Sequence, residues 1–306
     1  MDKINIGVDV GGTTINVGAV TADGRIIDKI TAHTQSGRGD SEMIIESIIY
    51  NIKALLKKLD LSNNDIASIG LGFPGTVESQ KGIVVFAPNI FFRNVDVKSK
   101  IAYTFNCPIY LGQDSRAAAW GEYCVGAGKN YNNIAAITIG TGIGCGLIIN
   151  GMIFHGGYNT AGEFGHQLLD PNGPQCNCGR KGCLETYCAG LAITQAGKAL
   201  GDNLKVKDIY QLAESGNKAA LKITEQVVHS LGIGMVNLIN LISLEMIAIS
   251  GGISNAPDHL LLNPLREFVQ KHAYSAVAQK IEIVHSSLGD NAPLIGAALL
   301  DETTEY

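Results

Sequence analysis

The sequence predicts an α/β fold of two related lobes with a cleft between them, and three observations lead to this prediction. The length of 306 residues corresponds to about two average domains. Short β-type apolar runs alternate with stretches in which apolar residues recur at helical spacing. A pattern near the start of the chain recurs about 130 residues later, and an internal repeat of this kind indicates related structural units. Small ligands usually bind in clefts between lobes.

The first copy of the pattern consists of three strands joined by two glycine-containing turns. Gly11-Gly12 supplies the first turn and Asp23-Gly24 the second, because such dipeptides favour hairpins. A helix follows, in which an apolar stripe is flanked by Lys and Glu. The expected elements are strands at 5–10, 15–20 and 25–31, a helix at 41–59, and strands at 68–73 and 107–111.

The second copy has the loop Gly140-Thr141-Gly142 and the turn Asn150-Gly151 in the corresponding places. The longest expected helix contains Gly232 and Gly234, each of which costs a helix about 1 kcal/mol relative to alanine. This helix should therefore pack closely against another element. The expected elements are strands at 134–140, 144–149, 152–155 and 245–250, and helices at 114–124, 184–200, 221–244 and 291–300. We expect a smaller lobe formed by residues 1–112 and 291–306 and a larger one formed by residues 113–290.

The composition indicates a folded cytoplasmic protein. With 46% hydrophobic and 17% charged residues, the chain is not of the disordered class. A net charge of −5 without a basic cluster disfavours a nucleic-acid partner. No run approaches the roughly 20 apolar residues of a membrane span, and no signal peptide precedes the first strand. The odd number of cysteines, seven, with three of them at 176–183, indicates a reduced protein with a metal site.

Glycine is enriched, at 37 of 306 residues, and three glycine-containing loops are candidate nucleotide-binding segments. In Asp9-Val10-Gly11-Gly12-Thr13-Thr14, the glycines would let a phosphate approach the backbone and the hydroxyls could bind its oxygens. A divalent cation would be needed between phosphate and carboxylate. A plain tight hairpin is the alternative. Gly140-Thr141-Gly142 could clamp the same polyphosphate, and Gly251-Gly252 could approach a nucleoside. No P-loop and no hydrolase G-x-S-x-G is present, and no dinucleotide G-x-G-x-x-G opens a helix after the first strand.

The strongest single motif is a set of metal-ligand residues spaced H-x9-C-x-C-x4-C. Three thiolates and one imidazole suit tetrahedral zinc, and four protein ligands make a closed, structural site. The flanking Gly179 and Gly182 fit a tight knuckle. The alternative is a chance cluster of buried cysteines. The predicted ligands are His166, Cys176, Cys178 and Cys183.

Three carboxylates are further candidates with two interpretations each. Asp114 follows a short strand and precedes an alanine-rich helix, so it is either a helix N-cap or a general base at the carboxyl end of the strand. On the residues alone, the cap is favoured. Glu163 and Glu185 flank the zinc motif, which would hold both rigidly enough to bind a sugar, although either could be a solvated surface charge.

The chain resembles the ROK family (repressors, open reading frames and sugar kinases) over nearly its whole length. The residues that carry the resemblance are Asp9 to Thr13, the run from Ala161 to His166, the cysteine motif through Glu185, and Ser250-Gly251-Gly252. The resemblance implies an actin/hexokinase-like (ribonuclease H-like) fold of two lobes, with ATP and a sugar meeting in the cleft. It also favours the general-base interpretation of Asp114 over the helix cap, because the family's catalytic base matches this residue.

The resemblance further implies roles for the candidate residues. Asp9 would help to orient Mg²⁺, and Asp114 would take the proton from the sugar hydroxyl. His166 would bind zinc through one nitrogen and sugar through the other. Phosphates and nucleoside would be held by Gly11, Gly12, Thr13, Gly140, Thr141, Gly142, Gly251 and Gly252, and the sugar by Asn89, Gln113, Asp114, Glu163, His166 and Glu185.

The implied activity is an ATP-dependent hexose kinase that phosphorylates the 6-hydroxyl of glucose or a related sugar. Gln113 departs from the family, which usually has Asn there, and this places the identity of the sugar in doubt. The alternatives are a kinase for N-acetylmannosamine, another N-acetylhexosamine or a β-glucoside. A sugar-responsive repressor of the same family is disfavoured, because a strand beginning by Ile4 leaves no room for a DNA-binding domain. Family members are often homodimers or homotetramers.

Overall fold

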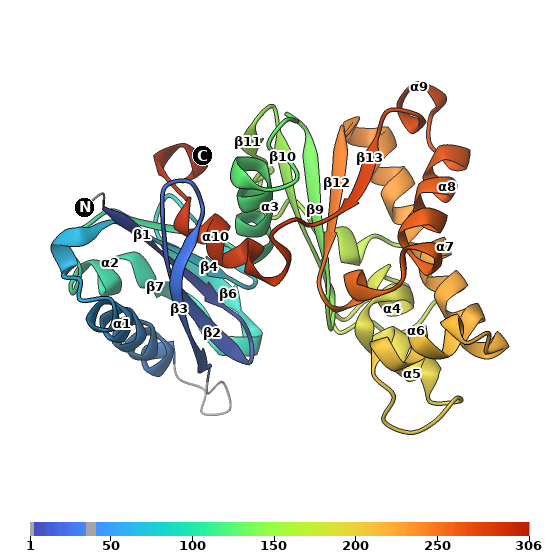
Figure 1. Cartoon of the computed structure of the whole chain (residues 1–306), viewed down its shortest axis with the longest axis horizontal. Helices are drawn as coiled ribbons and strands as arrows, with labels where there is room; N and C mark the ends of the chain where they lie inside the picture. Colours follow the sequence, from blue (N-terminus) through green and yellow to red (C-terminus); the bar gives the residue numbers. More distant parts are fainter. Residues whose placement is uncertain (1–2, 35–40, 306) are drawn as a thin grey trace. The chain divides into compact units, whose positions relative to one another are not determined.

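The computed structural model describes residues 3–34 and 41–305 (Figure 1). These residues form two compact units. The first unit comprises Met1–Asn130, Gly146–Ala161 and Asp290–Tyr306, and the second comprises Tyr131–Cys145 and Gly162–Gly289. No helix in the described ranges is long and apolar enough to cross a membrane.

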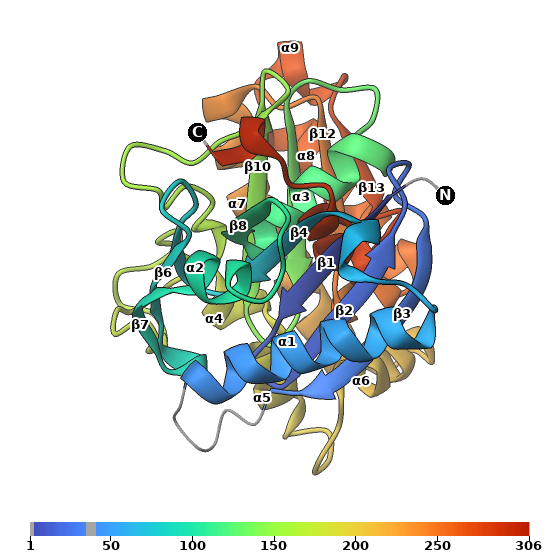
Figure 2. The same cartoon turned by 90° about the vertical axis from the view of Figure 1, so that its left-hand side faces the viewer.

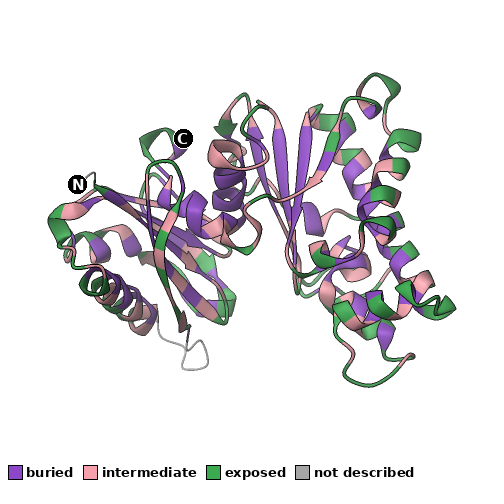
Figure 3. Ribbon diagram, in the orientation of Figure 1, coloured by how far each residue is buried: buried purple, intermediate pink, exposed green. Residues whose placement is uncertain are grey.

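A five-stranded sheet forms the centre of the first unit. Its order is β3-β2-β1-β4-β8, with β1 antiparallel to β2 and parallel to β4, and with β4 parallel to β8. The central strands are buried on both faces, and Figure 3 shows this as nearly continuous purple ribbons. The strands are β1 (Ile4–Val10), β2 (Thr14–Val20), β3 (Ile26–His33), β4 (Ile66–Phe73) and β8 (Ile109–Gln113).

The two faces of this sheet are covered by different helices. Helix α1 (Ser41–Lys58) packs its isoleucine and leucine stripe onto one face, across which it lies in Figure 2. Helix α10 (Ala292–Ala298) lies against the other. A Cβ atom at Gly7 would come within 2.2 Å of the Leu294 carbonyl oxygen, so the strand needs glycine where α10 touches it.

Helix α3 (Asp114–Val125) packs against α10 in the first unit. The approach is close, since a Cβ atom at Gly296 would lie 1.7 Å from the Ala117 carbonyl oxygen. This packing explains why residues 113–130 belong to the first unit, whereas we had expected them in the larger lobe. The hairpin at 146–161 joins them in this unit.

The first unit also contains a small antiparallel sheet that the sequence pattern did not reveal. Its strands are β5 (Thr76–Glu78), β6 (Ile83–Ala87) and β7 (Phe92–Asp96), followed by α2 (Val97–Ala102). These strands are short and half-exposed and are interrupted by glycine, proline and asparagine, so no clear period of two develops.

The second sheet repeats the order of the first, as the recurring pattern predicted. Its order is β11-β10-β9-β12-β13, with β12 parallel to β9 and to β13. The unit boundary at Cys145 divides β10, so this strand begins in the second unit and ends in the first. The strands are β9 (Ile134–Ile139), β10 (Ile143–Ile149), β11 (Met152–Ile153), β12 (Met246–Ser250) and β13 (Glu282–His285).

The remaining elements of the second unit are helices, and the single helix predicted at 184–200 is two helices in the structure. The helix expected at 184–200 is interrupted at Ala189, whose ψ of 162° is extended. The break turns the Gly190 amide toward the Gly140 carbonyl, to which it donates at 2.8 Å. The helices are α4 (Glu185–Cys188), α5 (Gly190–Gly197), α6 (Val206–Glu214), α7 (Lys218–Ile242), α8 (Leu262–His272) and α9 (Ser275–Ala278).

Candidate functional site

Asp9 stands near the carboxyl end of β1, immediately before the first glycine loop. Its side chain accepts a hydrogen bond from Asn16 Nδ2 at 3.1 Å. Burial raises the pKa of Asp9, and the Asn16 hydrogen bond opposes this effect. The loop itself is closed by a hydrogen bond from the Gly11 amide to the Thr14 carbonyl at 2.8 Å. A carboxylate that is costly to ionise would be stabilised by a divalent cation, which makes Asp9 a suitable Mg²⁺ partner.

Asp114 begins α3 directly after β8. The N-cap position belongs to Gln113, so the capping interpretation of Asp114 is wrong in detail. Its carboxylate instead accepts from the Ser115 amide at 2.6 Å. This places Asp114 at the carboxyl end of a parallel strand, where α/β sheets carry their functional side chains.

Asp9 and Asp114 lie on the same face of the first sheet. Side chains alternate along a strand, so Asp9 shares a face with Gly7, which meets α10. Asp9 is in register with Gly72 of the neighbouring strand, and a Cβ atom at Gly72 would lie 3.5 Å from Asp114 Cα. The Cα atoms of Asp9 and Asp114 are therefore separated by no more than about 10 Å.

The two other candidate sugar ligands of the first unit have different surroundings. Gln113 Oε1 is buried and has no hydrogen-bond partner among the described residues. Asn89 is exposed on the short turn Pro88–Ile90 between β6 and β7. That hairpin is tied to the end of β4, because a Cβ atom at Gly75 would lie 2.2 Å from the Phe86 carbonyl oxygen.

The second unit brings two glycine loops together at one edge of its sheet. Gly140 follows β9 and Gly251 follows β12, which are parallel neighbours. The hydroxyls of Thr138 and Ser250, near the ends of these strands, lie 3.0 Å apart. Gly251 has a φ of 88°, and its Cβ atom would lie 2.5 Å from the Ile139 carbonyl oxygen. The three glycine loops thus all follow the carboxyl ends of β1, β9 and β12.

Two of these loops contain a glycine that the packing of the described residues does not require. Among those residues, a Cβ atom at Gly140 or Gly252 would meet nothing within 4 Å, and neither glycine has a positive φ. Fold packing therefore accounts for Gly251 but not for Gly140. Space beside a backbone amide is what a phosphate or nucleoside needs for close approach.

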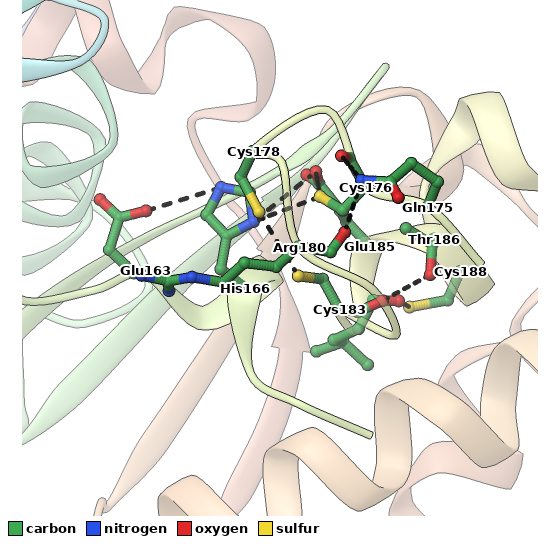
Figure 4. Close-up of polar contacts among 11 residues, drawn as sticks. Glu163, His166, Gln175, Cys176, Cys178, Arg180, Cys183, Glu185, Thr186 and Cys188 are labelled. Carbon is green, nitrogen blue, oxygen red and sulfur yellow. Dashed lines mark hydrogen bonds and ion pairs between the residues drawn. The ribbon is translucent and has the colours of Figure 1, made fainter. Parts of the chain in front are cut away.

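The predicted zinc ligands gather in one cluster of the second unit (Figure 4). One donor atom from each of His166, Cys176, Cys178 and Cys183 lies within 4.8 Å of every other. The Cys178 and Cys183 sulfurs are 3.6 Å apart, and Cys176 Sγ is 3.7 Å from His166 Nδ1. A tetrahedron with zinc–sulfur bonds near 2.3 Å has edges of about 3.8 Å. The cluster therefore fits zinc in donor type, number and spacing.

The loop that holds the cysteines is a tight knuckle. Cys176 donates its amide to the Arg180 carbonyl at 2.8 Å, and Gly179 donates to the Cys176 carbonyl at 3.0 Å. Gly182 has a φ of 69°, and its Cβ atom would lie 1.5 Å from the Asp170 carbonyl oxygen. No other residue fits at position 182, which confirms the expectation for this glycine.

The thiols of the cluster differ in acidity. A backbone hydrogen bond from Arg180 lowers the pKa of the exposed Cys178. Burial raises the pKa of Cys176, and the Glu185 carboxylate, which accepts from that thiol, raises it further. Metal binding needs thiolates, so uptake of zinc here would release protons.

Two carboxylates flank His166 on opposite sides, as Figure 4 shows. Glu163 Oε2 lies 3.8 Å from Nε2 of the ring, and Glu185 Oε1 lies 3.7 Å from Nδ1. The Nδ1 atom faces the thiols, which leaves Nε2 on the side of Glu163. The Glu185 side chain also borders the phosphate-loop candidate, since a Cβ atom at Gly142 would lie 3.0 Å from Glu185 Oε2.

The sequence interpretation missed two residues of this region. Asn16 was read only as part of a strand, yet it holds Asp9. Arg116 was read as part of an alanine-rich helix, yet it is only 2% exposed. An arginine on the apolar side of a helix was the available signal, because buried arginine is rare unless it is paired.

Comparisons with known proteins give the chain a family context. A model described as "ROK family" matches residues 5–304. A protein named "Glucokinase" from Halalkalibacterium halodurans is 34% identical, over 99% of this chain and 96% of that protein. A "Xylose repressor" from Bacillus subtilis is 32% identical, over 95% of this chain and 75% of the repressor.

Solved structures extend the comparison. A crystal structure of a ROK family glucokinase from Streptomyces griseus, in complex with glucose and AMPPNP, superimposes with a TM-score of 0.81. That match has 30% sequence identity and covers 96% of this chain and 98% of the other. The actin/hexokinase-like fold expected from the resemblance is thereby confirmed.

Proposed function

The chain belongs to the ROK family, and we propose that it is an ATP-dependent hexose kinase. In this proposal the γ-phosphate is transferred to the 6-hydroxyl of glucose or a related sugar. Full-length similarity to a glucokinase supports the kinase class, and similarity to a repressor supports only a shared sugar-binding fold.

The placement of Asp9 and Asp114 on one face of the first sheet carries the proposal. Phosphoryl transfer needs a group that orients the nucleophile and a group that handles the metal and its phosphates. The first unit supplies both carboxylates within about 10 Å of each other, and the strand that carries Asp9 leads into the first glycine loop. A repressor needs no such pair.

Asp114 takes the proton of the sugar hydroxyl as that oxygen attacks the γ-phosphorus in line. Asp9 would hold Mg²⁺ in the first unit, and the bound ion would neutralise charge on the phosphates. Gly11 to Thr13 and Gly140 to Gly142 contribute backbone amides toward phosphate oxygens, and Gly251-Gly252 lies by the nucleoside. Catalysis of this kind depends mainly on positioning and electrostatic stabilisation.

The remaining sugar contacts come from rigidly held side chains. Glu163 and His166 Nε2 lie together and can bind adjacent hydroxyls, with Glu185 on the other side of the imidazole. Zinc on His166 Nδ1 and the three thiolates would lock the ring in this orientation. Asn89 and Gln113 add amide groups, and Gln113 Oε1, which has no partner in the part of the chain that the structure describes, is available to accept from a sugar hydroxyl.

The test is a coupled assay of ADP release over hexoses, N-acetylhexosamines and β-glucosides with Mg-ATP. We expect the highest kcat/KM with glucose or one of its close relatives. No turnover of any sugar would overturn the proposal, and a preference for N-acetylmannosamine would reassign the substrate. Expectations of a cytoplasmic homodimer or homotetramer that binds no nucleic acid stay predictions, and light scattering would measure the oligomeric state.

A further inference from the structure

Arg116 makes an unusual set of hydrogen bonds within the first unit. It lies two residues after Asp114 on α3 and is almost completely buried. Its Nη1 donates to Asn159 Oδ1 at 2.7 Å, and its Nη2 donates to the carbonyl oxygens of Asn159 at 2.9 Å and of Ala161 at 3.1 Å. The Arg116 guanidinium thus binds the segment from Asn159 to Ala161 through two backbone carbonyls and one side-chain oxygen.

His155 and Asn159 complete this network. His155 Nε2 lies 3.0 Å from the Thr304 carbonyl oxygen, which can only accept, so Nε2 carries the proton. Nδ1 is then free to accept from Arg116 Nη1 at 3.2 Å. Burial lowers the pKa of His155, and the charge of Arg116 lowers it further, so the neutral imidazole is favoured. The Asn159 amide also donates to the Val77 carbonyl oxygen.

The segment that Arg116 holds ends where the chain passes from one unit to the other. Ala161 is the last residue of the first unit, and Gly162 is the first residue of the second. Gly162 has a φ of 94°, and its Cβ atom would lie 2.2 Å from the Cys145 carbonyl oxygen. Glu163, a proposed sugar ligand, follows directly.

The first turn of α3 also contacts a second of the four points at which the chain passes between the units. Gly146 is the first residue after the chain returns from the second unit. A Cβ atom there would lie 2.2 Å from the Ser115 carbonyl oxygen and 2.8 Å from Arg116 Cα. Two of the four crossings between the units, those at 145–146 and 161–162, are therefore fixed to the turn of helix that begins with Asp114.

From these contacts we propose that Arg116 is a positioning residue for phosphoryl transfer. It fixes the point from which the chain continues to Glu163 and His166, and it does so from the helix turn that carries Asp114. The point at which the chain leaves the first unit toward Glu163 and His166 therefore depends on the Arg116 fork, in which two nitrogens bind three oxygens of one segment. The inference rests on the proposed kinase function.

The test is Arg116→Lys, which keeps the charge but cannot reproduce the fork. We expect kcat to fall and the KM for sugar to rise, each by about 10-fold, because small displacements of reacting groups are costly. The KM for ATP and the metal content should stay within twofold. Arg266→Lys is the matched control, since Arg266 also donates to a backbone carbonyl, that of Ile283 at 2.8 Å, which lies within the second unit and far along the chain from residues 145–146 and 161–162.

Sugar kinetics of Arg116→Lys that match those of Arg266→Lys would overturn the proposal. Should Arg116→Lys fail to fold, Asn159→Ala removes one acceptor of the fork and should show the same split between sugar and ATP parameters. If the wild-type protein phosphorylates no sugar, the kinase function fails separately. Hydrogen exchange then still tests the contact, because Arg116→Lys should accelerate exchange in residues 155–163, and unchanged exchange would refute it.

Discussion

The thiol of Cys176 donates a hydrogen bond to Glu185 Oε1 at 3.0 Å. This contact joins the metal cluster to a carboxylate that the proposed function assigns to sugar binding. The second oxygen of the same carboxylate borders Gly142 in the candidate phosphate loop. Glu185 therefore contacts both the metal cluster and the candidate phosphate loop of the second unit. We expect loss of the metal to weaken substrate binding.

Cys178→Ser should abolish zinc binding and weaken sugar binding together. Elemental analysis should give about one zinc per chain for the wild type and much less for the variant. We expect a loss of several degrees in melting temperature and a rise of about tenfold in the Kd for sugar, since the His166 ring loses its anchor. Cys107→Ser, at a half-buried cysteine outside the cluster, is the control. Unchanged metal content in Cys178→Ser would show that the site is misassigned.

Asp114→Asn should remove turnover while leaving the sugar bound. The amide keeps the shape of the side chain but cannot accept the proton, so we expect kcat to fall by at least about 10³-fold. Calorimetry should detect sugar binding within a few-fold of the wild type. Asp60→Asn, in an exposed turn, should behave as the wild type. Activity near wild type in Asp114→Asn would assign the base to another residue.

Asp9→Asn should stabilise the fold at neutral pH while impairing nucleotide use. Burial raises the pKa of Asp9, so the folded state binds more protons than the unfolded state above pH 4 or so. This carboxylate therefore lowers the free energy of unfolding as pH rises through that window. The increase in the free energy of unfolding of Asp9→Asn should be present at pH 7 and should vanish as pH falls below the ordinary Asp pKa.

Thermal unfolding across pH 3.5–7.5 measures this effect. Asp28→Asn is a control whose effect on the free energy of unfolding should have the opposite sign. A hydrogen bond from Lys58 lowers the pKa of Asp28, so removing this carboxylate should destabilise the fold at neutral pH. Mg-ATP should raise the melting temperature of the wild type and not that of Asp9→Asn. Equal stabilisation of both proteins by Mg-ATP would exclude Asp9 from the metal site.

Gly140→Ala should fold normally and bind ATP poorly. A methyl group at this position meets no atom of the described residues within 4 Å and requires no positive φ. We expect an unchanged melting temperature and a KM for ATP raised by roughly tenfold, because the methyl group occupies the space beside the amide. Gly251→Ala is the contrast, since its Cβ atom collides with the Ile139 carbonyl and its φ is 88°. An unchanged KM for ATP in Gly140→Ala would remove this loop from the phosphate site.

Gln113→Asn should change the sugar preference more than the stability. The Gln113 Oε1 atom is buried without a partner in residues 3–34 and 41–305, and the shorter amide would withdraw it by about one methylene. We expect the ratio of kcat/KM values between glucose and N-acetylmannosamine to change by about 10-fold, the scale of one misplaced polar contact. A ratio within twofold of the wild type would show that Gln113 does not contact the sugar.

Local sequence patterns predicted the elements that have a clear period. The strands near 5–20 and the helix at 41–58 appear within one or two residues of the expected bounds. The break at Ala189 could not be predicted, because it depends on a hydrogen bond from Gly190 to Gly140, fifty positions earlier in the chain. The sheet of β5, β6 and β7 was missed because its strands are short and lack alternation.

The sequence by itself determined the composition of the metal cluster and the repeated order of strands. The ligand spacing and the turn-forming residues lie within short segments, so they can be recognised from the sequence. Only the tertiary structure decided which glycines have room for a ligand, that Asp9 and Asp114 share a face, and that Arg116 holds Ala161. These properties arise from close packing and hydrogen bonds between segments distant in the chain, which no local pattern encodes.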